Sequence, residues 1–202
     1  MPRPVKASPD AFGTLVVTII SQNTADTNTE RAYRKLEENL KLTPKALAEA
    51  PRSQIEDCIK VAGLWQAKAE AIQVASRIIL DRYNGSLDAI ISLPVEEARK
   101  VLMAMQGVGP KTADVVLLFS ANKPTIPVDT HVNRVSRRLG FAPAVGGYDA
   151  VRLSLQAHFK PEDYLGVHLL LIGLGRAYCK AHKPLCPKCP VNRLCPSNWR
   201  TQ

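Results

Sequence analysis

Four cysteines near the end of the chain carry the clearest chemical signal in this sequence. They follow the pattern Cys179-x6-Cys186-x2-Cys189-x5-Cys195. Thiolates packed this densely in a basic chain without a signal peptide indicate a metal centre rather than disulfides. The cysteines alone leave two kinds of centre open, a structural zinc ion and a cubane iron–sulfur cluster held by four thiolates. Because there is one CxxC pair and the outer cysteines lie farther away, the spacing favours the cluster.

A second candidate site is the segment 105–113, with the sequence MQGVGPKTA. A helix that ends near Met105 would turn through Gly107 and Gly109, since glycine permits positive φ and close approach of a phosphate. Pro110 then opens the next helix, whose free N–H groups and positive dipole end favour an anion. The pattern predicts a helix-hairpin-helix, a motif that grips the DNA backbone without reading its sequence.

Lys111 follows this turn, and its role depends on a motif 18 residues further on. In many hairpins the same position only meets phosphate, whereas an amine can also act as a nucleophile. The second motif, PVDTHVNR at residues 127–134, places Asp129 before a helix that begins near Thr130. Asp129 could simply cap that helix. Paired with Lys111 at this distance, however, it resembles a known catalytic couple.

The elements that must position these residues are helices. Apolar residues recur at helical spacing from AFGTLVVTIISQ (11–22) to YLGVHLLLIGLGRAYC (164–179). Two short stretches, VVLLF and PTIPV, could suggest strands, but they lie in helical context, so we predict an all-α fold. The last helical pattern continues through Gly175, which indicates close packing there. Cys58 is predicted to be a buried, small apolar residue.

Charge and composition limit the partners. The chain of 202 residues has 27 Lys and Arg against 18 Asp and Glu, a net charge of +9. This balance favours a polyanion, most commonly nucleic acid. Aromatic residues make up only 5%, which argues against an extended base-stacking platform. No run approaches the roughly 18–20 apolar residues of a membrane span. We expect no membrane association and a monomer that is intracellular, cytoplasmic and nucleoid-associated in a prokaryote.

Five segments occur in a telling order: SQNTAD (21–26), GLWQAKA (63–69), GVGPKTA (107–113), VDTHVNRV (128–135) and the four-cysteine pattern. In this order they resemble the endonuclease III family, DNA glycosylases of the helix-hairpin-helix superfamily with a Gly/Pro-rich loop and a catalytic Asp. The family's corresponding elements are an SxQxTD-type segment, GLYxxKA, GVGRKTA, VDTHIxRV and a [4Fe–4S] loop. Asn23 stands at the usual Gln. The resemblance runs from Phe12 to Cys195.

The resemblance implies a two-lobed fold. A six-helix barrel lobe with the helix-hairpin-helix would span residues 12–122. Residues 1–11 and 123–202 would form the iron–sulfur cluster lobe. The four cysteines would hold a [4Fe–4S] cluster with a structural role, and the partner would be double-stranded DNA with damaged bases or abasic sites.

The resemblance also implies a mechanism in which the damaged base is first rotated out of the duplex. Lys111 would attack the sugar C1′, and the resulting Schiff base would undergo β-elimination, which nicks the strand 3′ to the lesion. Asp129 would stabilise positive charge on the sugar. Leu64 would be an apolar wedge rather than a core leucine, and Gln22 or Asn23 would probe the orphaned base. Further DNA contacts are expected from six residues: Gly107, Val108, Gly109, Thr112, His131 and Lys183.

Within the superfamily, Lys111 favours a bifunctional glycosylase and abasic-site lyase acting on oxidised or ring-saturated pyrimidines. Adenine-removing relatives need an acid on the first barrel helix, which this chain lacks, and mismatch-thymine relatives carry tyrosine at the lysine position. Two alternatives stay open: a monofunctional glycosylase in which Asp129 activates water, and a non-catalytic, damage-sensing DNA-binding protein. The chain departs from the family at Gln106 (usually Pro) and Pro110 (usually Arg). It also begins shortly before the first barrel helix, so we expect a minimal form or an incomplete start.

Overall fold

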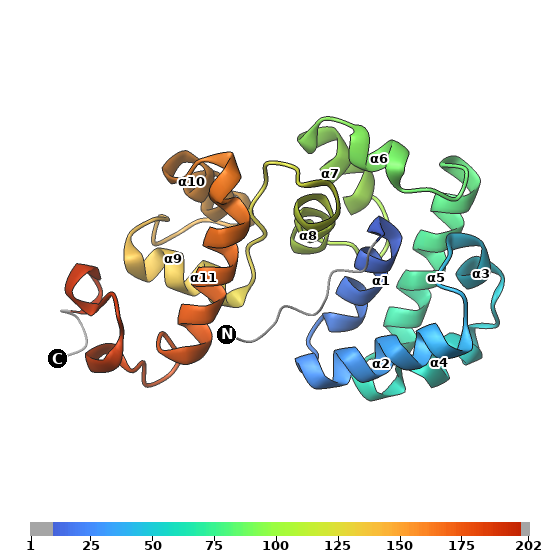
Figure 1. The fold of residues 1–202 in the computed structure, drawn as a ribbon, viewed down its shortest axis with the longest axis horizontal. Helices are drawn as coiled ribbons and strands as arrows, with labels where there is room; N and C mark the ends of the chain where they lie inside the picture. The colour runs from blue at the N-terminus through green and yellow to red at the C-terminus, as the bar shows by residue number, and fades with distance from the viewer. Residues whose placement is uncertain (1–9, 199–202) are drawn as a thin grey trace. The chain divides into compact units, whose positions relative to one another are not determined.

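The computed structural model describes residues 10–198 and is helical (Figure 1). None of the described residues lies in a β-strand, so the all-α prediction is confirmed. The stretch VVLLF lies within a helix, whereas PTIPV is an irregular connection that is neither helix nor strand. Among the described helices, none combines the length and apolar character needed to cross a membrane.

The described chain divides into two compact units, residues 10–123 and 124–198. Residues 10–123 form eight α-helices: α1 (Ala11–Ser21), α2 (Asp26–Asn39), α3 (Pro44–Glu49), α4 (Arg52–Ile59), α5 (Trp65–Arg82), α6 (Asp88–Ser92), α7 (Val95–Met103) and α8 (Pro110–Ala121). Residues 124–198 form three α-helices: α9 (Thr130–Leu139), α10 (Tyr148–His158) and α11 (Tyr164–Ala177).

Helix α1 is the central element of the first unit. Its residues from Ala11 to Ile20 are all buried, as expected for a helix that is apolar on every side. It packs against α8, α2 and α5, and Figure 1 shows it between α8 and α5. Around it, α3 packs on α5, α2 on α4, and α7 on α8. The surrounding helices therefore hold the end of α1 and the α7–α8 turn in one packed body.

Helix α11 organises the second unit by packing against α9, which also contacts α10. The helix continues through Gly175, as predicted, and close packing is the reason. A Cβ at Gly175 would lie 2.9 Å from Nδ1 of His131. After α11, the chain forms two short 3₁₀ turns, Cys186–Lys188 and Asn192–Leu194, that carry part of the cysteine pattern.

Candidate functional site

The predicted hairpin is formed by α7, the turn 104–109 and α8. Gly107 has φ +79°, so the turn requires its left-handed backbone. Gly109 does not: with φ −88° and ψ 177° it is the extended N-cap of α8, and Pro110 occupies the first turn. The prediction of positive φ is therefore correct for Gly107 and wrong for Gly109. The built Cβ of Gly109 meets no atom within 4 Å, so this glycine leaves open space beside the helix N-terminus.

A buried ion pair joins the two hairpin helices. Nε of Arg99 on α7 donates to Oδ1 of Asp114 on α8 at 2.8 Å, and Nη2 lies 3.4 Å from Oδ2. The Arg99 side chain is 4% exposed and the Asp114 side chain 0%. Two nearly parallel N–H···O contacts between a guanidinium and a carboxylate fix the relative orientation of the two groups as well as their separation. The pair therefore sets how α8 leaves the turn.

Two of the predicted DNA contacts in the hairpin also contribute to its packing. Val108 and Thr112 are both buried. The N–H of Val108 donates to the carbonyl of Met105 at 3.1 Å, and the Thr112 hydroxyl accepts from Nε2 of Gln22 at 3.2 Å. These bonds tie the hairpin turn and the start of α8 to the rest of the unit. Lys111 is the second residue of α8, at the helix end suited to an anion.

Asp129 lies in the second unit and does cap α9. Its Oδ1 accepts from the N–H of Val132 at 2.7 Å. A cap uses one carboxylate oxygen, so the capping role and a chemical role are compatible. Asp129 also lines a cavity of about 340 Å³, with Thr130, Asn133 and Tyr148 among the other lining residues.

His131 is held in one tautomer by its neighbour. Nη2 of Arg134 lies 3.0 Å from its Nδ1. A guanidinium can only donate, so Nδ1 must accept and the proton of the neutral ring is on Nε2. Nη2 of Arg134 also donates to the carbonyl of Gly175 at 3.3 Å. Arg134 thereby connects His131 to α11 and fixes the orientation of the ring.

Gln22, Asn23 and Leu64 lie on two loops of the first unit. Nε2 of Gln22 donates to the carbonyl of Gly107 at 2.9 Å, which ties the end of α1 to the hairpin turn. Asn23 and Leu64 are exposed and both left-handed, with φ 52° and 49°. Leu64 is 63% exposed, so the alternative of a core leucine is excluded.

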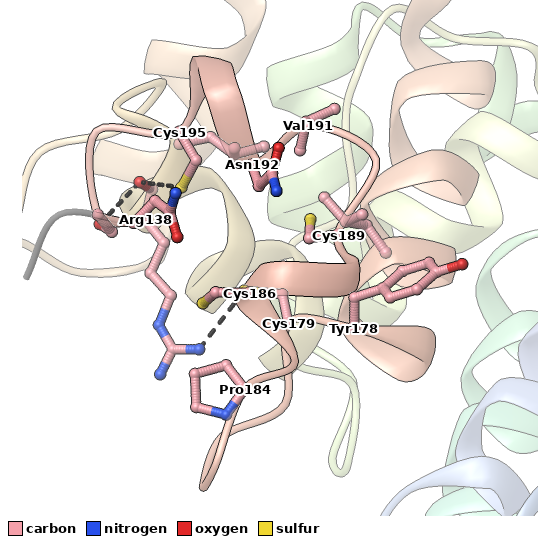
Figure 2. Close-up of a pocket in the computed structure, with 13 residues that line it drawn as sticks. Arg138, Tyr178, Cys179, Pro184, Cys186, Cys189, Val191, Asn192 and Cys195 are labelled. Carbon is pink, nitrogen blue, oxygen red and sulfur yellow. Dashed lines mark hydrogen bonds between the residues drawn. The ribbon is translucent and has the colours of Figure 1, made fainter. Parts of the chain in front are cut away.

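The four cysteines of the C-terminal pattern line one cavity of about 150 Å³ (Figure 2). This is the size of an engineered cavity, ~150 Å³, that holds benzene. Among residues 10–198, no three His, Cys, Asp or Glu side chains are grouped closely enough to hold a single metal ion. The thiols are thus spread around a space rather than gathered on a point. This arrangement suits a polynuclear cluster better than one zinc ion, whose Zn–S distances are ~2.3 Å.

Arginines of α9 support this pocket. Nη1 of Arg138 lies 3.4 Å from Sγ of Cys179 and donates to the carbonyl of Lys180 at 2.7 Å. Nε of Arg134 donates to the carbonyl of Cys179 at 2.8 Å. A guanidinium is thus placed to donate a hydrogen bond to the sulfur of Cys179. Lys183, a predicted DNA contact, is exposed on the same loop with φ 49°.

The sequence reasoning missed three side chains that shape these sites. Arg138 lies beside the cysteines, Tyr148 lines the Asp129 cavity, and Lys68 is buried beneath the loops that carry Asn23 and Leu64. The hydroxyl of Tyr148 accepts from the N–H of Val128 at 3.1 Å. An available signal was the VNRVSRR pattern of α9, which returns its arginines to one face at helical spacing. Lys68 is the lysine of the GLWQAKA segment, but the helical pattern around it did not show that its side chain is buried.

Comparison with known proteins agrees with this fold. The family profile described as "HhH-GPD superfamily base excision DNA repair protein" matches residues 16–161. Endonuclease III of Sulfolobus acidocaldarius is 38% identical over 187 residues, which cover 92% of this chain and 82% of that protein. Endonuclease III of Escherichia coli K12 is 36% identical, with 91% and 82% covered.

A solved structure shows the same fold. A trapped endonuclease III–DNA covalent intermediate matches with a TM-score of 0.83 and 34% identity, covering 95% of this chain and 85% of that one. The helical fold, the hairpin and the family match define a base excision DNA glycosylase. Within that class the chain belongs to the endonuclease III family of the HhH-GPD superfamily.

Proposed function

We propose that the protein is a bifunctional DNA glycosylase and abasic-site lyase for oxidised or ring-saturated pyrimidines in double-stranded DNA. The observation that carries the proposal is Lys111 at the N-terminal turn of the hairpin helix, in a chain whose Asp129 caps α9 beside a cavity. Lysine, rather than tyrosine, at this hairpin position provides an amine nucleophile. The related structure trapped as a covalent endonuclease III–DNA intermediate supports the same chemistry.

Base release begins with the neutral amine of Lys111. Its nitrogen lone pair forms a bond to the sugar C1′, and the bond between C1′ and the base breaks. The base leaves with that electron pair and takes up a proton. Asp129, whose second carboxylate oxygen is not needed for the cap, stabilises the positive charge that develops on the sugar and accepts the proton that Lys111 gives up.

Strand cleavage follows from the same lysine adduct. Opening of the sugar ring leaves a protonated imine between Lys111 and C1′, which makes the C2′ hydrogen acidic. Loss of that proton allows the C3′–O bond to break, with the 3′ phosphate as leaving group. Water then hydrolyses the imine and frees Lys111. The strand is thus cut 3′ to the lesion.

We assign DNA positioning to residues of both units. Leu64 fills the space left by the extruded base, Asn23 with Gln22 faces the orphaned partner base, and Gly107 with Gly109 lets a phosphate approach α8. His131 and Lys183 contribute further phosphate contacts from the second unit. Contacts of this kind add affinity without sequence information and weaken as salt rises.

We further propose that the four cysteines hold a [4Fe–4S] cluster, because all four line one cavity and, among the described residues, no three of them are grouped closely enough to hold a single ion. Bound there, the group supplies a covalent cross-link that stabilises the cysteine loop. Arg138 and Arg134 orient the loop from α9. Iron and acid-labile sulfide analysis, with zinc measured alongside, tests this assignment; Cys186→Ser should lose iron, whereas Cys58→Ala should keep it.

Borohydride trapping tests the reaction. With an abasic duplex or a duplex containing thymine glycol, the wild type should form a covalent adduct, and Lys111→Ala should form none. Lys100→Ala, an exposed lysine on α7, is the matched control and should react as the wild type does. Base release without any adduct would instead show the monofunctional, Asp129-activated water mechanism. Binding without base release would show a non-catalytic protein.

A further inference from the structure

Lys68 is a buried lysine for which the reaction described above provides no role. It lies on α5 and is 4% exposed. Its Nζ donates to three oxygens: the carbonyl of Ile20 at 2.9 Å, the hydroxyl of Thr24 at 2.6 Å and the carbonyl of Ala62 at 2.9 Å. An ammonium group has three donors, so all three are used.

The three acceptors belong to two loops that are far apart in the sequence. Ile20 is in the last turn of α1, and Thr24 lies in the loop between α1 and α2. Ala62 ends the 3₁₀ turn Lys60–Ala62. The Thr24 hydroxyl also donates to the carbonyl of Ala62 at 2.6 Å, so it bridges the loops as well. One ammonium group therefore joins the loop that carries Asn23 to the loop that carries Leu64.

A cation suits this position, although burial opposes it. Burial lowers the pKa of Lys68 below the ordinary lysine value. The end of α1 presents carbonyls at the negative end of its dipole, and a cation there is favoured. Three acceptors in hydrogen-bond contact also favour the charged form. The side chain is thus held by directional bonds rather than by apolar packing alone.

Two residues beside these acceptors have left-handed backbones, Asn23 with φ 52° and Leu64 with φ 49°. Asparagine adopts this conformation readily, whereas for Leu64 it costs ~1–2 kcal/mol. Such strain persists only where the surroundings impose it. The bonds that Lys68 makes within three residues of each tip provide that constraint.

This hydrogen-bond network extends to the hairpin. Nε2 of Gln22 donates to the carbonyl of Gly107 and to the hydroxyl of Thr112. Gln22 itself lies between Ile20 and Thr24, the two acceptors of Lys68 in this loop. Hydrogen bonds therefore connect the loop that carries Leu64, the loop that carries Asn23 and the hairpin turn within the first unit.

We infer that Lys68 is a positioning residue that holds Leu64 and Asn23 at a fixed separation, so that the wedge and the partner-base probe enter the duplex together. The inference rests on the proposed function, because it assumes that these two tips enter DNA. Lys68 does not touch the reacting atoms. It acts on extrusion of the base and on reading of the opposite base.

The test compares Lys68→Met with a matched control, Gln73→Met. Gln73 lies on the same helix, is equally buried at 4%, and donates through Nε2 to the carbonyl of Ala50 at 2.8 Å, the C-cap of α3. Both substitutions leave buried carbonyls without a donor and put the same side chain in place. Only one of them releases the two loops.

The readouts are single-turnover base release from thymine glycol opposite A or G, fluorescence of 2-aminopurine placed opposite the lesion, and affinity for undamaged duplex. A misplacement of ~1 Å can cost on the order of 100-fold, so Lys68→Met should slow base release by ~10- to 100-fold. It should also reduce the change in 2-aminopurine fluorescence and the difference in rate between A and G opposite the lesion. Its affinity for undamaged duplex should stay within about twofold of that of the control. Lys68→Arg, which keeps the charge, should recover part of the rate.

If Lys68→Met does not fold, Thr24→Val takes its place, because it removes the hydroxyl that bridges both loops and keeps the β-branched shape. The inference is overturned if Lys68→Met releases base at the same rate and with the same opposite-base preference as Gln73→Met. The same holds if Thr24→Val, used in its place, matches Gln73→Met. In either case, base release by the wild type would still uphold the proposed function. Failure of the wild type to release base or form the borohydride adduct would overturn the proposed function itself.

Discussion

Replacement of Gly107 by alanine is opposed in two independent ways, which makes the hairpin turn the sharpest place to test the fold. The backbone of Gly107 has φ +79°, where a residue with a Cβ loses ~1–2 kcal/mol. A Cβ there would also lie 2.5 Å from Cβ of Ala71 on α5. Because the Ala71 methyl is attached directly to the helix backbone, it cannot rotate away.

The two costs add to a measurable loss. Overpacking of this kind costs ~1–3 kcal/mol, so Gly107→Ala should lower the free energy of unfolding by ~2–5 kcal/mol in total. Gly109→Ala is the matched control, since its φ is −88° and its built Cβ meets no atom within 4 Å. Its expected cost is ~1 kcal/mol or less, from replacing glycine at an N-cap. In contrast, both variants should bind DNA more weakly, because both add a methyl group where a phosphate approaches.

A double-mutant cycle separates the clash from the backbone strain. Ala71→Gly costs ~1 kcal/mol by itself through helix propensity, but it removes the methyl that Gly107→Ala would strike. The double variant should therefore lose ~1–3 kcal/mol less unfolding free energy than the summed losses of the two single variants. The strain from positive φ should remain in it.

Urea unfolding followed by tryptophan fluorescence measures these differences. The chain has two tryptophans, so Trp199→Phe leaves Trp65, in the hairpin's own unit, as the sole reporter. The reasoning is refuted if Gly107→Ala is within ~0.5 kcal/mol of Gly109→Ala, the spread of ordinary surface substitutions. A cycle with no coupling energy would refute the steric part alone.

Three further predictions follow from single side chains. Asp114→Asn should cost ~1–3 kcal/mol in urea unfolding and weaken duplex binding by anisotropy, because Arg99 loses its buried carboxylate partner and keeps only the ion pair with the exposed Glu96, at 2.9 Å. Burial raises the pKa of the Cys58 thiol above its ordinary 9.0, so the folded state keeps a proton that the unfolded chain loses. That stabilisation is complete below pH 9.0 and is lost as the pH rises through the folded-state pKa. The difference in unfolding free energy between wild type and Cys58→Ala should therefore shrink from pH 8 to the alkaline end of a titration. A difference that stays constant with pH would contradict this prediction. Leu64→Gly should raise the melting temperature, since it relieves ~1–2 kcal/mol of left-handed strain, while slowing base release. Unchanged or faster base release would count against the wedge, and a lower melting temperature would count against the strain.

Features determined by local sequence could be predicted, whereas those set by distant contacts could not. Helical periodicity located α1 and α11, and the capping role of Asp129 followed from an Asp placed before a helix. The continuation of α11 through Gly175 also followed from its pattern. The extended backbone of Gly109 was missed because GxG spacing does not distinguish a left-handed turn residue from an open N-cap.

Lys68 shows why the rest of the candidate site was out of reach. In the sequence it belongs to the GLWQAKA segment, at the start of a long amphipathic helix, and nothing in that pattern shows which atoms its amine contacts. Its burial depends on the carbonyl of Ile20, 48 residues away, and on the turn at Ala62. The same holds for Arg99, whose partner Asp114 is 15 residues distant across the hairpin. The sequence shows that a residue is charged, but tertiary packing determines whether its side chain is exposed or buried.

Two buried polar contacts of the first unit, the Arg99–Asp114 pair and the Lys68 ammonium group, join elements that carry the hairpin turn and the loops of Asn23 and Leu64. Apolar burial is non-directional, so it stabilises a fold without specifying where one atom lies. Reacting atoms must approach to ~3–3.5 Å in alignment, which directional bonds can enforce. By this reasoning, the Arg99–Asp114 pair and Lys68 exist for positioning rather than for stability.

The double variant Arg99→Met/Asp114→Leu tests that distinction. Replacing a buried ion pair by apolar residues of similar volume is often neutral or stabilising by ~1–4 kcal/mol. The double variant should therefore recover the stability that Asp114→Asn loses, because no unpaired charge remains. If the pair positions α8, base release and borohydride trapping should stay well below wild type despite that recovery. Full activity in the stable double variant would show that the charge pair contributes only packing, and the hairpin would then owe its geometry to Gly107 and the apolar core alone.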